Sequence, residues 1–231
     1  AAGEAVLDAQ HTALGIEHDS QGNRAKAYLY CLETRCPETG WMVPMAPSWV
    51  ISKTRKVVAR LVPDHANKRF AIEIHSGVTD AEMRAAERGT VRDGNLIYEL
   101  DGKSYRTPIK TIRGDYRDAD GNNANRLRRW EKHDFKPRRT DIFQERLYCI
   151  QWIKHESLGQ SRKETFFTSV TAEDLKRERK VEAIVSEHLA RWQDDGLTPD
   201  MVIEIGGPPR YQGRELLMAR GWMYWHQVFS S

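Results

Sequence analysis

Short segments in which apolar and polar residues alternate run through much of this chain, and this two-residue period is typical of β-strands. The clearest example is Arg69–His75, where Phe70, Ile72 and Ile74 alternate with polar or small residues. Asp101-Gly102 favours a tight hairpin turn between two further segments of this kind. The pattern predicts strands over residues 25–32, 48–52, 57–62, 69–75, 96–100, 103–106, 146–155, 163–170 and 201–205.

One segment closer to the C-terminus follows a helical period instead. Thr171-Ala-Glu-Asp174 resembles a capping box, and Gly196 ends the pattern. Between them lies one apolar stripe, formed by Val181, Ile184, Val185, His188, Leu189 and Trp192. We therefore expect a long amphipathic helix over about residues 172–193, a shorter one over 79–88 and a short N-terminal helix over 1–15. The predicted fold class is α+β, with mainly antiparallel strands, in a single domain over residues 1–231.

The cysteines and the lack of long apolar runs indicate the environment of the chain. Cys31, Cys36 and Cys149 are an odd number of cysteines, which argues against a secreted disulfide framework. No stretch approaches the roughly 18 apolar residues that a membrane span needs, and residues 1–20 lack a signal-peptide pattern. These features predict a cytoplasmic protein without a membrane partner.

No complete catalytic apparatus is recognisable in the sequence. A dinucleotide or S-adenosylmethionine domain needs a strand, a Gly-rich turn and a helix in succession, yet Gly206-Gly207 runs into Pro208-Pro209. Proline removes the backbone donors that a phosphate cradle requires. A P-loop, a nucleophile elbow and a His-Glu-x-x-His helix are missing as well. We predict no catalytic residue and no bound cofactor in this chain.

Positive charge is concentrated in one segment with few apolar residues. The formal net charge is +3, but residues 103–139 hold twelve Lys/Arg against five Asp/Glu, so this window carries +7 and the rest carries −4. We interpret residues 113–139 as a long loop with one helical turn near 125–130. Arg and Lys neutralise phosphates, and the interleaved Trp130 and Phe135 could stack on bases, whereas a solvated basic face with core aromatics is the alternative. The candidate nucleic-acid contacts are Arg126, Arg128, Arg129, Lys132, Lys136, Arg138 and Arg139, with a smaller cluster at Lys53, Arg55 and Lys56.

Cys36-Pro-Glu-Thr-Gly40 has the residues of a zinc knuckle except at one ligand position. Thr39 stands where a Cys-Pro-x-Cys-Gly knuckle places its second cysteine, and no second cysteine pair exists elsewhere. We therefore predict no metal site and interpret residues 25–53 as a degenerate, knuckle-like hairpin. Cys149 lies in an apolar strand and is predicted to be a small buried residue.

Several blocks of the sequence together resemble one family, the bacterial adenine-specific DNA methylases described as containing a zinc ribbon. These blocks follow one another from about residue 25 to the C-terminus. They are Ala27–Cys31, Cys36–Pro44, Ser48–Lys53, Asp141–Tyr148 with Gln151-Trp152, and Gly221–Phe229. The family has knuckle cysteines at the positions of Thr39 and of residues near 93–100, which hold no cysteine here.

The resemblance implies a region inserted between the S-adenosylmethionine motif and the Asp-Pro-Pro-Tyr motif of such a methylase. Neither motif occurs in this sequence. The resemblance thus leads us to expect a DNA-recognition or substrate-positioning insert, whose partners are DNA and the remainder of the methyltransferase and whose parent uses S-adenosylmethionine. A structural or protein-interaction module, bracing the methyltransferase core or docking a partner of a defence or modification system, is the alternative. The aromatic residues Trp222, Tyr224, Trp225 and Phe229 favour that alternative.

Overall fold

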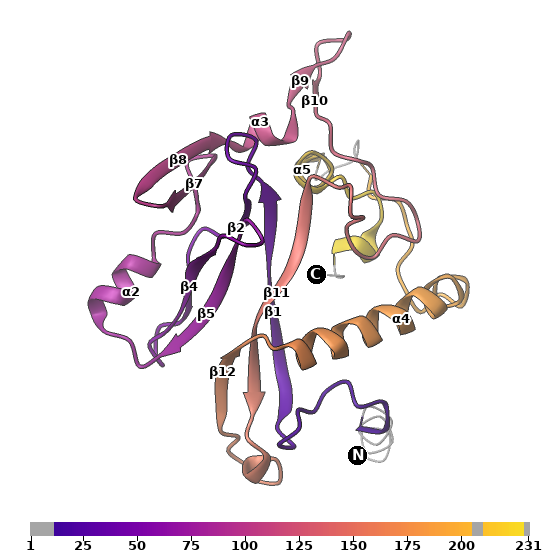
Figure 1. The fold of residues 1–231 in the computed structure, drawn as a ribbon. Helices are drawn as coiled ribbons and strands as arrows, with labels where there is room; N and C mark the ends of the chain where they lie inside the picture. The colour runs from indigo at the N-terminus through magenta and orange to yellow at the C-terminus, as the bar shows by residue number, and fades with distance from the viewer. Residues whose placement is uncertain (1–11, 205–209, 229–231) are drawn as a thin grey trace.

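A seven-stranded sheet forms the centre of the protein, whose computed structural model describes residues 12–204 and 210–228. The strand order is β12, β11, β1, β2, β5, β4, β3, and the neighbours pair antiparallel except for β2 and β5. The strands are β1 (Arg24–Arg35), β2 (Met42–Met45), β3 (Val50–Ser52), β4 (Val57–Asp64), β5 (Arg69–Ser76), β11 (Phe143–Ile153) and β12 (Thr165–Ser169). The two longest strands, β1 and β11, are neighbours at the middle of the fold (Figure 1).

Two smaller antiparallel units lie at the end of the sheet where β1 finishes (Figure 1). One is a three-stranded sheet of β6 (Val91–Arg92), β7 (Asn95–Leu100) and β8 (Lys103–Pro108), and the other is a hairpin of β9 (Tyr116–Arg117) and β10 (Asn123–Ala124). Asp101 and Gly102 both have positive φ, at 52° and 75°, and form the two-residue turn between β7 and β8. This confirms the hairpin predicted from the Asp-Gly pair.

Within residues 12–204 and 210–228, helices α2 (Asp80–Ala86), α3 (Ile109–Arg113), α4 (Ala172–Asp194) and α5 (Arg210–Arg220) surround the sheets, with 3-10 turns at His155–Ser157 and Trp225–Val228. The capping box of α4 is confirmed, because Asp174 N–H donates to Thr171 Oγ1 and Thr171 N–H donates to the Asp174 carboxylate. Thr79 caps α2 with Glu82 in the same way. Residues 12–14 are helical, and the rest of the predicted N-terminal helix lies outside the described residues.

The fold is α+β with mainly antiparallel strands and one long helix, as the sequence predicts. Among the described residues, no helix has the length and apolar character to span a bilayer. The apolar core joins the main sheet to the three-stranded sheet through Cys36, Trp41, Val43, Phe70, Leu96, Tyr98 and Leu100. All three cysteines are buried free thiols, which confirms the prediction for Cys149.

Several local features differ from the sequence-based expectation. The helical turn near residues 125–130 was wrong, because the backbone N–H groups of Arg126 and Trp130 donate to the distant carbonyls of Arg113 and Gly221. The β9–β10 hairpin lies in the segment predicted to be a loop, and of the strand predicted over residues 201–205 the described part forms only an isolated bridge between Val202 and Tyr224. Helix α3, strand β2 and helix α5 were not predicted. A proline inside β2 and two glycine-containing flanks around α5 obscure their periods, so neither element stands out from the sequence.

A buried carboxylate links three strands on one face of the main sheet. Glu33 of β1 is held by Arg69 of β5 at 3.1 Å and by Arg146 of β11 at 3.3 Å. Arg146 also donates to the carbonyl of Phe70 at 2.7 Å. The guanidinium groups of Arg69 and Arg146 share this one buried carboxylate. Removing its negative charge would therefore leave both of them without a counter-charge.

We therefore expect Glu33→Gln to lower the free energy of unfolding by about 3 kcal/mol. Urea unfolding followed by tryptophan fluorescence measures this change. Glu73→Gln is the matched control, because Glu73 is exposed and lies only beside His75. The control should change stability by no more than about 0.5 kcal/mol. Equal effects of the two substitutions would contradict a structural role for the Glu33 ion pairs.

Candidate nucleic-acid interface

The segment of residues 125–141, here called the basic loop, has a fixed shape although it contains no helix or strand. Asn125 donates to the carbonyl of Met218 at 2.7 Å, and Trp130 packs edge-on against Trp222. Gly221 has φ +78°, and a Cβ at that position would lie 2.1 Å from the carbonyl oxygen of Arg128. Glycine is therefore required there for the loop to pass so close to the end of α5.

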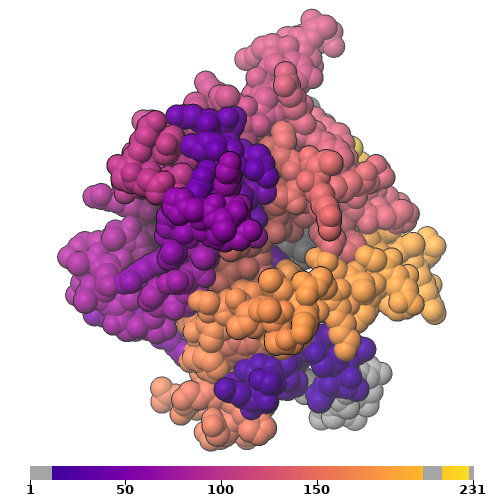
Figure 2. Space-filling view, in the orientation of Figure 1, coloured from indigo at the N-terminus to yellow at the C-terminus, as the bar shows by residue number. Residues whose placement is uncertain are grey.

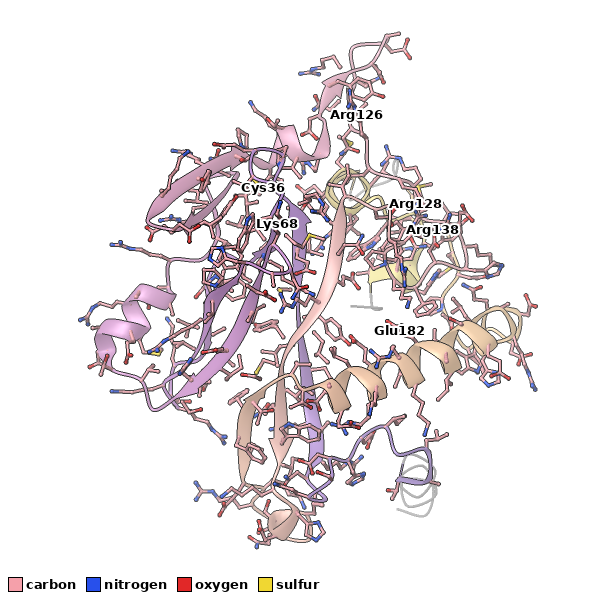
Figure 3. All side chains as sticks on the ribbon, viewed as in Figure 1. Cys36, Lys68, Arg126, Arg128, Arg138 and Glu182 are labelled. Carbon is pink, nitrogen blue, oxygen red and sulfur yellow. The ribbon has the colours of Figure 1, made fainter. Side chains whose placement is uncertain are left out.

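Arg128 is the centre of an ion-pair cluster within the basic loop. Its guanidinium binds Asp141 through two hydrogen bonds of 2.8 Å and also binds Asp134. Burial opposes ionisation of Asp134, but the N–H of Glu131 and the guanidinium of Arg128 outweigh it and lower the pKa of that carboxyl. Arg138 also binds Asp134. Figure 3 shows Arg128 and Arg138 close together and pointing into the same region of the loop.

Other predicted contact residues are also paired within the protein. Lys132 binds Asp200 at 2.8 Å, Lys136 binds Glu182 of α4, and Arg129 donates to the carbonyl of Leu217. The smaller cluster lies in the β3–β4 turn beside α2, away from the basic loop (Figure 1). There Lys53 lies 3.9 Å from Glu87, Lys56 binds Asp80 at 2.9 Å, and Arg55 donates to the carbonyl of Thr165. The structure thus separates the two predicted clusters.

Seven exposed cations of the +7 window have no ion-pair partner among the described residues, and we call them the cationic stripe. They follow β8, α3, the β9–β10 hairpin and the basic loop, along the upper and right-hand edge in Figure 1. They are Lys103, Arg106, Lys110, Arg117, Arg126, Arg129 and Arg139. Only Arg126, Arg129 and Arg139 were predicted. The other four belong to the same charged window, and its net charge was the signal that could have identified them.

The sheet, α4 and the basic loop enclose a groove of about 770 Å³, here called the α4 groove. Tyr28, Tyr30 and Leu147 come from the sheet, and Val181 and Val185 come from α4. Lys136, Arg138 and Arg139 lie at the end formed by the basic loop. Figure 2 shows α4 and the basic loop near one another on the same face of the molecule. The loop therefore takes part in both the stripe and the groove.

Two carboxyl groups in the α4 groove ionise less readily than usual. Burial raises the pKa of Glu145 on β11 to about 7, against the opposing effect of Arg220. Burial also raises the pKa of Glu178 on α4, and the Tyr30 hydroxyl opposes this. Neither oxygen of Glu145 has a hydrogen-bond partner within the described part of the chain. Titratable carboxyls of this kind in a concave site are typical of functional sites.

The knuckle-like turn at Cys36–Trp41 is closed by hydrogen bonds. Burial opposes ionisation of the Cys36 thiol, but hydrogen bonds from the Tyr98 hydroxyl, the Thr39 N–H and Thr107 lower its pKa. The Thr39 and Tyr98 hydroxyls are themselves 2.6 Å apart. No cluster of three or more His, Cys, Asp or Glu side chains suited to a metal occurs among residues 12–204 and 210–228. The Gly206–Pro209 turn lies outside the described residues.

Comparison with protein-family models, with curated proteins and with solved structures found no match to this chain.

We expect Arg128→Ala to lower the free energy of unfolding by about 3 kcal/mol at neutral pH, because Asp134 and Asp141 are each only 10% exposed and lose their cation. The depressed pKa of Asp134 stabilises the protein above the pKa of the unfolded chain, and this contribution disappears as pH falls through the folded value. The loss caused by Arg128→Ala should therefore shrink in acid. Chemical denaturation at several pH values measures it.

Arg129→Ala is the control for this prediction, because Arg129 makes one hydrogen bond to a carbonyl and no ion pair among the described residues. Its cost should stay near 1 kcal/mol and should not depend on pH in the acid range. A pH-independent loss for Arg128→Ala would show that its ion pairs do not stabilise the loop.

We also expect the purified chain to contain far less than one zinc per molecule. The Cys36 thiol is buried and occupied by hydroxyl and backbone donors, and Thr39 is a poor substitute for a thiolate ligand. Elemental analysis after purification without chelator measures the metal content. One zinc per chain, with a melting temperature that drops on chelation, would contradict this expectation.

Proposed function

We propose that this chain is a DNA-recognition or substrate-positioning insert of a cytoplasmic, S-adenosylmethionine-dependent adenine-specific DNA methyltransferase. The cationic stripe is the observation that carries the proposal. Its seven guanidinium and ammonium groups are exposed and uncompensated among the described residues, so phosphate oxygens are suitable partners for them. DNA and the remainder of the methyltransferase are the proposed partners, and the parent enzyme supplies the cofactor and the catalytic motif.

The β9–β10 hairpin supports a duplex as the target. It projects from the body of the protein, as Figure 1 shows, and Lys110, Arg117 and Arg126 lie at or beside it. The major groove of DNA admits a two-stranded β-ribbon. Asn122 and Asn123 near its tip are exposed, and their amides are of the type that pairs with adenine. In this arrangement the cations bind the phosphates of the DNA backbone and so position the hairpin, while the hairpin itself contacts the edges of the bases in the groove.

A docking function is the second candidate, and an exposed apolar patch favours it. Leu197 is 73% exposed, Met201 64% and Val202 53%, and Trp225 lies next to them because its N–H donates to the carbonyl of Met201. Exposed apolar groups that gather in one place are typical of protein interfaces. This patch is suited to packing on the core of a methyltransferase or on a partner of a modification system.

The stripe predicts how DNA binding by this chain depends on salt. Replacing both Lys110 and Arg126 with Ala should weaken binding to all duplex sequences alike and flatten the log–log salt dependence by up to about two units. The reason is that each phosphate neutralised by the protein releases condensed counterion from the DNA. A variant with two fewer phosphate contacts releases fewer counterions, so its binding depends less steeply on salt. Fluorescence anisotropy with short labelled duplexes over a range of salt concentrations measures both quantities.

The matched control removes two cations at the opposite end of the sheet, with Lys154→Ala and Arg162→Ala. These residues flank the 3-10 turn at His155–Ser157 and lie far from the hairpin in Figure 1. The control should bind like the unmodified chain. Equal affinity and slope for both double variants would remove the stripe from the DNA interface and leave the docking function as the better account.

A further inference from the structure

Contacts at the two ends of α4, and between Glu178 and the Tyr30 hydroxyl, hold this helix over the sheet and leave the α4 groove beneath it. Near its start, Arg177 binds Asp174 and lies over the ring of Trp152 at 5.5 Å. Near its end, Gln193 donates to the carbonyl of Lys132 at 2.8 Å and bonds to His133. The middle of the helix reaches the basic loop through Lys136 and Glu182. A volume of about 770 Å³ therefore remains beneath the helix, within the range of small-ligand sites.

Two aromatic rings on the floor of the groove are unusually exposed for a central strand. Tyr28 is 42% exposed and Tyr30 38%, although β1 has neighbours on both sides. Leu147 lies beside them on β11, and Val181 and Val185 face them from α4. A flat aromatic or heteroaromatic ligand would bury these surfaces, and bases stack well on tyrosine.

Most charged groups around Glu145 have a partner within the protein. From α4 these are Arg177, paired with Asp174, and Glu182, paired with Lys136, while Glu178 lies against the Tyr30 hydroxyl. From the basic loop, Asp134 is paired with Arg138 and Arg128, and Asp141 with Arg128. At the edges, Glu17 is paired with Arg24, His133 is bonded to Gln193, and Arg220 of α5 approaches Glu145 without an ion pair. Glu145 and Arg139 are left without a hydrogen-bond or ion-pair partner among the described residues.

These two groups define what the groove can recognise. A neutral carboxyl presents one donor and one acceptor side by side, and an amine next to a basic ring nitrogen presents the complementary pair. The pairing edge of each of the four bases carries a donor beside an acceptor, so a neutral carboxyl can pair with any of them. Arg139, with Arg138 beside it, offers a cation at the end of the groove where a phosphate attached to such a base would lie.

We propose that the α4 groove receives one unstacked nucleotide, whose base edge pairs with the carboxyl of Glu145 and whose phosphate meets Arg139. The base stacks on Tyr28 or Tyr30. This inference rests on the proposed DNA-binding function and deepens it, because it assigns to this chain a pocket that holds an extruded nucleotide. Unstacking costs a few kcal/mol, and such pockets offset it by stacking and edge pairing.

Titration of the 231-residue chain with 5′-dAMP, followed by amide chemical shifts, tests the pocket without any duplex. At about pH 6 we expect saturable shifts in β1, β11 and α4, and binding at least about tenfold weaker for inorganic phosphate, which has no base to stack or pair. Because the neutral carboxyl is the binding form, affinity should fall by up to about tenfold per pH unit above pH 7. Tyr28→Ala should weaken binding at every pH.

Glu145→Gln separates recognition from a structural effect. The amide keeps one donor and one acceptor, so this variant should still bind 5′-dAMP but lose the pH dependence. Glu145→Val should lose binding, and Glu187→Gln on the exposed side of α4 should behave like the unmodified chain. No saturable binding of 5′-dAMP, or equal binding of 5′-dAMP and inorganic phosphate without pH dependence, would overturn the proposal. Duplex binding that depends on Lys110 and Arg126 would survive either result, so the two proposals fail separately.

Discussion

The pairing of β1 with β11 is the constraint on which the rest of the structure depends. It matches Arg24 with Ile153 at one end and Thr34 with Phe143 at the other, so it joins segments more than a hundred residues apart. The ion pairs of Glu33 add β5 to the same centre. Since β11 begins directly after the basic loop, the register of this pairing also fixes where the loop ends. The Thr34 hydroxyl, which donates to the carbonyl of Ile142 at 2.8 Å, secures that junction.

Charge in this protein divides into two populations with different physical roles. Arg128, with two largely buried carboxylates, is too strongly bound to leave them for a phosphate, because stripping one partner from such a pair costs several kcal/mol. An exposed cation such as Lys110 or Arg126 has no comparable bond to give up. The cations that we predicted from the sequence therefore include several in the basic loop that are paired, and they omit the exposed cations Lys103, Arg106 and Lys110 of β8 and α3, which have no ion-pair partner among the described residues.

Local rules in the sequence predicted local structure well. Asp101-Gly102, Thr171 with Asp174, and the alternating residues of β5 each specify a conformation through neighbours a few positions away. The candidate site depends on partners that are distant in sequence, such as Arg128 with Asp141 and Lys132 with Asp200. A charge pattern contains no information about which acid will face which base, so the split between paired and free cations required the structure.

The α4 groove shows the same limit for apolar patterns. The stripe from Val181 to Trp192 predicts a helix whose one face is buried in a core, yet only Leu189 of that stripe is fully buried. Contacts of polar side chains also hold α4 in place: Arg177 lies over the ring of Trp152 on β11, and Gln193 donates to the carbonyl of Lys132 in the basic loop. A largely buried carboxyl without a partner, as at Glu145, lowers stability unless something binds it. The α4 groove is thus a gap that the apolar stripe does not fill, and it contains the Glu145 carboxyl, which has no hydrogen-bond partner among the described residues. A ligand that packs on the apolar side chains and bonds to Glu145 would account for both features.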